Sequence, residues 1–284
     1  MKLAYHTNTW GGVVGHPAGV TSVKDLFYLT PGSTEAALAD ISMAGYQGFE
    51  LFDGNLMEFA EREEEFRNLL ERHCLEIVGV YSGANFIFPE ILDEELSKIE
   101  RAAAFAARLG TTHLVVGGGA VRSIGIDDRD FQLLGEGLER VVEIADRVGL
   151  TPSFHPHLGT CAISPEQIAR TFEHTTIGFC PDTAHLEAGG GVPAELMRVY
   201  RDRLAYVHLK DYADGAFLPL GRGHQDFGEM LDVLDEIGYG GWVTTELDAF
   251  NGPPLTGAQI SKAYLDELLA RRHSGEHGRG GTEA

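Results

Sequence analysis

Short apolar runs alternate with longer segments of helical periodicity along most of the chain. The apolar runs begin at residues 3, 48, 77, 113, 151, 177, 205 and 242, which are on average about 34 residues apart. Apolar residues recur at helical spacing between them, as in 33–45, 93–109 and 127–148. The pattern therefore predicts eight strand–helix units in sequence.

Capping residues mark where two of the later helices should begin. Ser164, Pro165 and Gln167 have the spacing of a capping box with proline at the first helical position. Thr256 and Gln259 have the same spacing, and they predict a helix over 256–272.

Eight βα units in about 250 residues predict a single (β/α)8 TIM barrel of the α/β class. We expect the barrel to occupy residues 1–272 and the polar tail 273–284 to be disordered. A doubly wound open sheet is the alternative, but it would need a glycine-rich phosphate turn after the first strand, where this chain reads HTNTWGG. Residues 10–32 show no periodicity, so they are either a loop over the site or a plain insertion.

The charge and the cysteine content indicate which partners and which cellular compartment to expect. The 284 residues carry 43 Asp and Glu against 22 Lys and Arg, a formal charge of −21, which argues against nucleic acid as a partner. The three cysteines have no paired spacing, so a reducing cytoplasm is expected. Neither a signal peptide nor a membrane span is expected from the hydropathy. No sequence feature indicates an interface, so homo-oligomerisation is left open.

Acidic and imidazole side chains gather at the predicted strand ends, which in a barrel meet at one face. These residues are Glu50, His155, His157, Asp182, His208 and Glu246. Two imidazoles and two carboxylates without a thiolate form a donor set for Mn²⁺, with Mg²⁺, Co²⁺ or Zn²⁺ as alternatives. The predicted metal ligands are His155, Asp182, His208 and Glu246.

Other polar residues are expected near the same mouth. His6 lies on the first strand, His185 follows the sixth, and Lys210 shares a face of the seventh with the predicted histidine ligand. Asp211 is expected to orient a neighbouring imidazole. Arg222, in GRGHQDF, either contacts a phosphate or hydroxyl of the substrate or belongs to a plain turn before a helix.

The motifs DTAH, HLKD, GRGHQDF and WVTTELD, in this order and spacing, resemble those of the xylose isomerase-like TIM barrels. That superfamily includes sugar isomerases, epimerases, inosose dehydratases and, more distantly, endonuclease IV. The resemblance covers strands five to eight well and the first four in outline. It implies that Asp182, His208 and Glu246 bind a metal. The strand-five ligand, a Glu in the family, falls on His155, in a segment HPHLGT similar to the HHHMGT of inosose dehydratases. Either His155 or His157 could be the ligand there.

The resemblance also implies a reaction, namely abstraction of a proton next to the carbonyl of a sugar or cyclitol. Glu246, Glu50 or His157 would take the proton, while His185 and Lys210 would hold substrate hydroxyls. Reprotonation at another position would make the protein an isomerase or epimerase, which is the first expectation. Loss of a β-substituent would instead make it a lyase or dehydratase acting on a keto-sugar, an inosose or a 3-keto-glycoside.

Two further functions are weaker alternatives. A nuclease acting at abasic sites, by analogy with endonuclease IV, is disfavoured by the charge of −21. A non-catalytic sugar-binding subunit is disfavoured because the ligand set is complete apart from the change of Glu to His on strand five.

Overall fold

A closed barrel of parallel strands forms the centre of the protein. The computed structural model describes residues 1–10, 23–24 and 27–274, and in this part of the chain eight strands hydrogen-bond in the order β8-β7-β6-β5-β4-β1-β12-β9. They are β1 (Lys2–His6), β4 (Gly48–Phe52), β5 (Glu76–Gly83), β6 (His113–Gly117), β7 (Thr151–His155), β8 (Gly178–Phe179), β9 (Val207–Leu209) and β12 (Trp242–Thr245). Parallel bridges from Phe179 to Leu204 and from Asp182 to His208 join the two ends of this sheet. The predicted (β/α)8 barrel is therefore confirmed.

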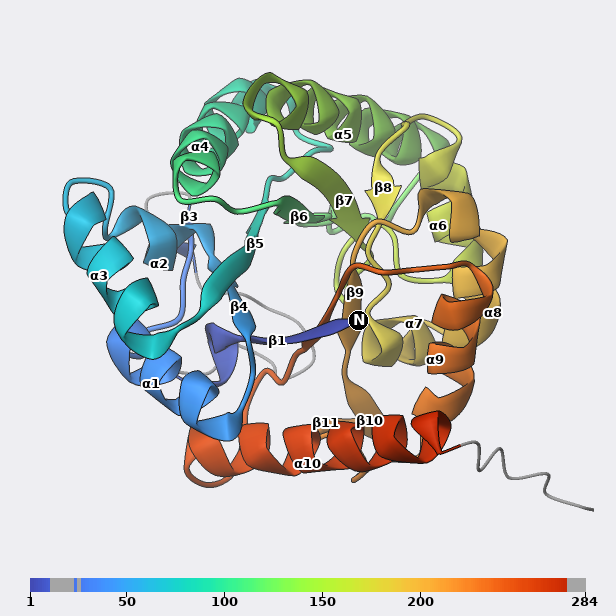
Figure 1. Cartoon of the computed structure of the whole chain (residues 1–284). Helices are drawn as coiled ribbons and strands as arrows, with labels where there is room; N and C mark the ends of the chain where they lie inside the picture. Colours follow the sequence, from blue (N-terminus) through green and yellow to red (C-terminus); the bar gives the residue numbers. More distant parts are fainter. Residues whose placement is uncertain (11–22, 25–26, 275–284) are drawn as a thin grey trace, which may run out of the picture.

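Helices surround the strands on the outside of the barrel (Figure 1). They are α1 (Thr34–Ala44), α2 (Asp53–Met57), α3 (Glu63–His73), α4 (Pro89–Arg108), α5 (Asp128–Val148), α6 (Pro165–Phe172), α7 (Thr183–Ala188), α8 (Pro193–Val199), α9 (Phe227–Glu236) and α10 (Pro254–His273). The 3-10 helices η1 (Thr7–Thr9) and η2 (Arg201–Arg203) and the hairpins β2 (Val23–Lys24)–β3 (Phe27–Tyr28) and β10 (Asp211–Ala213)–β11 (Ala216–Leu218) complete the described elements. None of the described helices is long and apolar enough to cross a membrane.

Successive side chains along a strand point alternately outward, toward the helices, and inward, toward the centre of the barrel. One set of side chains packs outward against the helices, and a smaller cluster that includes Val115, Cys180 and Tyr206 packs together separately from it. Because side chains two residues apart point to the same face, Tyr206 is followed on its face by His208 and then by Lys210. The inner face of the strand is therefore apolar near its start and becomes polar toward its carboxyl end.

Helix starts agree with the sequence pattern in one case and differ in another. The capping box of Ser164 and Gln167 is present at α6, as predicted. The capping box predicted at Thr256 and Gln259 is wrong, because α10 begins at Pro254. Proline has a helical φ and no N–H to satisfy, so the helix can start two residues earlier without a side-chain cap.

Two predictions concern residues outside the described part of the chain. The predicted loop at 10–32 includes residues 11–22 and 25–26, which lie outside the described residues. Residues 275–284 of the predicted tail also lie outside them. The described part of the 10–32 segment contributes Tyr28, whose ring lies beside Tyr81 with centroids 5.9 Å apart.

Candidate metal centre

The barrel brings the four predicted metal ligands together. His155 ends β7, Asp182 precedes α7, His208 lies in β9 and Glu246 follows β12. One nitrogen or oxygen from each lies within 4.8 Å of the other three. All four side chains are buried. Parallel strands of one barrel end at the same face, which is why residues so far apart in sequence meet here.

Each of the four residues has a buried polar atom that makes no hydrogen bond to any described residue. These atoms are His155 Nε2, Asp182 Oδ2, His208 Nδ1 and Glu246 Oε2. His155 Nε2 lies 3.5 Å from Asp182 Oδ2 and 3.7 Å from Glu246 Oε2, and His208 Nδ1 lies 2.9 Å from the same Glu246 oxygen. The lack of a hydrogen bond is costly for a buried polar atom, and this set of two nitrogens and two oxygens suits a divalent metal ion.

The chain itself binds the other oxygen of each carboxylate. Asp182 caps α7, where its Oδ1 accepts a hydrogen bond from the backbone of His185 at 2.9 Å. Glu246 Oε1 accepts a hydrogen bond from Asn8 Nδ2 at 3.0 Å. Both carboxylates are thereby held with their second oxygen, Oδ2 or Oε2, directed at the shared point.

Lys210 places an ammonium group beside this cluster. Its Nζ lies 3.2 Å from Asp182 Oδ2, 3.3 Å from Glu246 Oε2 and 3.2 Å from Asp248 Oδ2. Burial alone would lower the pKa of Lys210, but the three carboxylates outweigh it and raise the pKa. For Glu246, burial would raise the pKa, but Lys210 and His208 hold it well below its usual range. Lys210 is therefore a charged donor at the site.

His157 and His185 form a pair of imidazoles next to the four ligands. Their ring centroids are 3.9 Å apart, and the His157 ring is 5.6 Å from that of His155. His157 Nδ1 lies 2.8 Å from the carbonyl oxygen of Leu158, which can only accept, so Nδ1 carries the hydrogen and Nε2 has a free lone pair. Burial lowers the pKa of His157 to about 4, so the ring is neutral at neutral pH. A neutral imidazole with a free lone pair can act as a general base.

Aromatic rings line the side of the site near β4 and β5. The Tyr81 ring is 5.5 Å from those of His155 and Phe52, and Tyr28 packs on the same group. Asp53, the first residue of α2, accepts a hydrogen bond from the backbone of Tyr28 at 2.8 Å. This carboxylate is held in turn by the buried ammonium of Lys98 at 3.1 Å, so a buried ion pair fixes the backbone of Tyr28.

His6 and Glu50 lie behind the cluster, although both were predicted to act on the substrate. His6 Nδ1 accepts a hydrogen bond from the backbone of Asn8 at 3.0 Å, and its Nε2 lies 3.8 Å from Glu50 Oε1. Burial lowers the pKa of His6 to about 4. Glu50 Oε2 lies 2.8 Å from His208 Nε2. Both side chains are fully buried, so these contacts within the chain do not favour the predicted roles.

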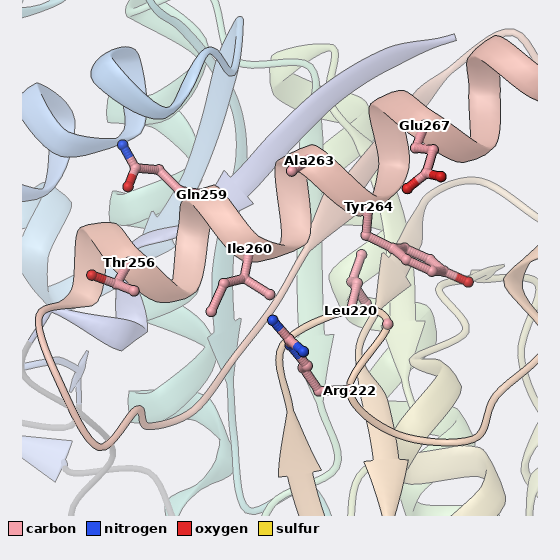
Figure 2. Close-up of a pocket in the computed structure, with 9 residues that line it drawn as sticks. Leu220, Arg222, Thr256, Gln259, Ile260, Ala263, Tyr264 and Glu267 are labelled. Atoms are coloured by element: carbon pink, nitrogen blue, oxygen red, sulfur yellow. The ribbon is translucent and has the colours of Figure 1, made fainter.

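Asp211 differs from expectation, and Arg222 lines a separate pocket. Asp211 does not orient an imidazole, because its carboxylate accepts the backbone N–H groups of Tyr212, Gly221, Gly223 and Gln225 and so shapes the loop after β11. Figure 2 shows Arg222 beside α10, in a pocket of about 420 Å³ that it lines with Ile260, Tyr264 and other residues of that helix. None of the four cluster residues lines this pocket. A contact between Arg222 and the substrate stays a prediction.

Several residues of the site were missed by the sequence patterns. Asn8 was expected on the same face as His6 but was given no role, and Asp248 lies two residues after Glu246, so alternation could have indicated it. Tyr81 and the Asp53–Lys98 pair carried no such signal. An aromatic residue in a buried strand predicts only packing, and an ion pair between residues 45 positions apart is visible only once the fold is known.

Comparisons with known proteins agree with this geometry. The family model described as xylose isomerase-like TIM barrel matches residues 38–268. An inosose dehydratase from Geobacillus kaustophilus is 28% identical over 272 residues, which cover 83% of this chain and 87% of that protein. The structure of a D-tagatose 3-epimerase-like protein superposes with a TM-score of 0.76 at 19% identity, covering 97% and 99% of the two chains. A probable 3-DHS dehydratase from Bacillus anthracis gives a TM-score of 0.71 at 16% identity, covering 95% and 99%.

Proposed function

Because this chain belongs to the xylose isomerase-like TIM barrel family, we propose that it is a divalent-metal-dependent enzyme that removes a proton next to the carbonyl of a keto-sugar or cyclitol. The observation that carries the proposal is the set of four buried donor atoms, one from each of His155, Asp182, His208 and Glu246, that face one another without hydrogen-bond partners among the described residues. The mixed nitrogen and oxygen set favours Mn²⁺, with Mg²⁺, Co²⁺ or Zn²⁺ as alternatives. A metal bound there would supply Lewis-acid stabilisation of the negative charge that develops on the substrate oxygens.

Among the predicted proton acceptors, His157 suits the role best. Glu246 contacts Lys210 and His208, and its Oε2 is one of the four candidate ligand atoms, so it is not free to take a proton. Glu50 is buried behind His208 and does not face the cluster. His157 is neutral, has its Nε2 lone pair free and lies beside the cluster. We therefore assign the proton abstraction to His157 Nε2.

Lys210 and His185 would act at the leaving group, in the step that follows proton abstraction. Lys210 Nζ lies 3.2 Å from His185 Nε2, and both are within the site. After the α-proton has moved to His157, the electrons of the broken C–H bond would form the enediolate. Electrons on the enediolate oxygen would then re-form the carbonyl, the pair from the C–H bond would form a new C=C bond, and the β C–O bond would break with its electrons on the departing hydroxide. The departing hydroxide would take a proton from Lys210 to leave as water, and the substrate would be dehydrated.

Elimination is favoured over epimerisation because the site has one free base and one ammonium donor. Epimerisation needs a second base on the opposite face of the substrate. The position where the family has a strand-five Glu is His155, whose Nε2 is directed at the metal site. The dehydratase relative at 28% identity supports an inosose as the substrate class. Epimerisation is the second candidate, favoured by the likeness to a D-tagatose 3-epimerase-like protein.

The test combines metal analysis with a substrate panel. Purified protein loaded with Mn²⁺ would be incubated with inososes, ketoses and 3-keto-glucosides in D₂O and followed by NMR. We expect an unsaturated product from an inosose, and loss of that product after chelation or in His157→Asn. His174→Asn, which changes an exposed histidine on the outer surface, is the matched control.

Three outcomes would count against the proposal in different ways. Full turnover after exhaustive chelation would exclude a metal-dependent reaction. Solvent deuterium in recovered sugar without an unsaturated product would replace elimination by epimerisation or isomerisation. A chain that transforms none of the panel while binding a sugar would favour the non-catalytic subunit.

A further inference from the structure

Glu50 occupies a space that the barrel leaves for it beneath the candidate metal centre. It lies on β4 and is fully buried. A Cβ atom added at Gly79 on the neighbouring strand β5 would lie 3.2 Å from Glu50 Oε2, which is tighter than ordinary contact. The absence of a side chain at Gly79 therefore leaves room for the Glu50 carboxylate against the inner wall.

The contact of Glu50 with His208 fixes which edge of that ring faces the other candidate ligand atoms. Glu50 Oε2 lies 2.8 Å from His208 Nε2, and a carboxylate can only accept, so Nε2 carries a hydrogen. The opposite nitrogen, Nδ1, is the one that lies 2.9 Å from Glu246 Oε2 among the four candidate ligand atoms. Metal-binding histidines commonly donate their other N–H to a carboxylate, which fixes the tautomer and the ring orientation.

His6, on the neighbouring strand β1, lies next to Glu50. The backbone N–H of Asn8 donates to His6 Nδ1 at 3.0 Å, so neutral His6 carries its hydrogen on Nε2. That nitrogen faces Glu50 Oε1 at 3.8 Å. The His6 ring also packs on Phe52, with centroids 4.7 Å apart, which limits its rotation. Asn8, His6, Glu50 and His208 thus form one line of contacts from the end of β1 to the metal centre.

We propose that Glu50 is a positioning residue that orients His208 so that Nδ1 is directed at the metal, and that it takes no part in proton transfer. This inference rests on the proposed metal-dependent function. It gives Glu50 a role in metal affinity, in place of the role in proton abstraction that its position at a strand end had suggested. His6 acts through Glu50 in the same line of contacts.

The test measures metal affinity in Glu50→Gln and Glu50→Ala by competition with a chelator, using Mn²⁺ and Zn²⁺. We expect affinity to fall by about 10- to 100-fold in Glu50→Ala, as for other carboxylates that support a histidine ligand. Glu50→Gln keeps an acceptor oxygen but loses the charge, so its affinity should fall less. In the diamagnetic Zn²⁺ form with ¹⁵N-labelled histidine, the His208 Nε2–H signal should be present in the wild type and lost or exchange-broadened in Glu50→Ala. Turnover in Glu50→Gln should return at saturating metal.

Glu95→Gln is the matched control, since Glu95 is also a buried carboxylate but contacts Asn85 after β5. It should leave metal affinity unchanged. Wild-type metal affinity in both Glu50 variants would overturn this inference and leave the proposed function standing. The same holds if Glu50→Gln binds metal with wild-type affinity but loses turnover that saturating metal does not restore. A wild-type protein that binds neither metal would overturn the proposed function as well. If Glu50→Ala does not fold, the metal affinity of the isosteric variant Glu50→Gln tests the inference.

Discussion

Replacing Lys98 by methionine should destabilise the protein strongly and in a pH-dependent way. Lys98 lies in α4 and is 1% exposed, with Nζ 3.1 Å from Asp53 Oδ2 and 2.6 Å from the carbonyl oxygen of Gly83. Methionine has a similar length and fills the same space, but it provides neither the charge nor a hydrogen-bond donor. The variant therefore leaves the buried Asp53 carboxylate without its counter-ion.

The size of the loss follows from these contacts. Removing one partner of a buried ion pair typically costs about 3–5 kcal/mol. Asp53 keeps hydrogen bonds from the backbones of Tyr28 and Gly54 and from Ser82 Oγ, which places the ionic part at the low end of that range. The unsatisfied carbonyl of Gly83 adds roughly 1 kcal/mol. We expect the free energy of unfolding to fall by about 4 kcal/mol at pH 7.

The pKa of Asp53 gives the sign of the pH dependence. Burial raises this pKa above its ordinary value of 3.8, and Lys98 opposes that rise. A raised carboxyl pKa means that the folded state binds the proton more tightly than the unfolded state. Its contribution to stability is then fully present below the ordinary pKa and is lost as the pH rises through the folded value. Without Lys98 the pKa rises further, so the penalty of Lys98→Met should be largest near neutral pH and should shrink on acidification.

Urea titration at several pH values between 4 and 7, followed by tryptophan fluorescence, measures this loss. Arg140→Met, which removes the exposed ion pair with Asp93, is the control and should change stability little. Combining Lys98→Met with Asp53→Asn should recover part of the loss, because no buried charge is then unpaired. A loss below about 1 kcal/mol at pH 7, or one that grows toward acid, would refute the reasoning.

Three further predictions concern the metal centre. Lys210→Met should tighten Mn²⁺ binding by more than about tenfold, because it removes an ammonium group that lies within 3.3 Å of Asp182 Oδ2 and Glu246 Oε2. Weaker binding in a calorimetric titration would contradict this. His155→Ala should weaken Mn²⁺ binding by at least about tenfold, whereas His155→Glu should keep it, and equal affinities in the two variants would exclude His155 as a ligand. Dialysis against a chelator should abolish turnover and added Mn²⁺ should restore it, as followed by product NMR, and restoration by Mg²⁺ alone would revise the metal.

The sequence predicted the barrel well because its signals are local. Each strand and helix is encoded in its own periodicity, and the equal direction of parallel strands then brings residues such as His155 and Asp182 together without further information. The short strand β8 shows the limit, since Asp182, which was predicted at the end of that strand, lies beyond it and caps α7. A capping aspartate and a strand-end aspartate look alike in sequence.

The roles within the site could not be predicted, because they depend on which atom faces which. Glu50 was predicted near a strand end like the ligands, but it is the middle residue of β4, and it contacts Nε2 of His208 on the opposite edge of the ring from Nδ1. Asp211 follows Lys210 directly, yet its carboxylate holds the loop after β11. Arg222 lines a pocket with residues of α10, and the sequence did not decide between a substrate contact and a turn at this position. These differences arise from rotamers and loop paths, which residue spacing does not specify.

The change from Glu to His on strand five has a chemical consequence that fits elimination. With His155 and His208 as neutral ligands, only Asp182 and Glu246 would bring negative charge to a divalent metal, so more positive charge would remain to stabilise an enediolate than with a third carboxylate. The charge of Lys210 is meanwhile matched by Asp248 at 3.2 Å, so it stays available as a donor beside the cluster. The proposed base, His157, is uncharged and would not repel the developing anion. A site with a less neutralised metal, one neutral base and one ammonium is suited to removing a proton on one side and protonating a leaving hydroxide on the other, which is the asymmetry that dehydration requires and epimerisation does not.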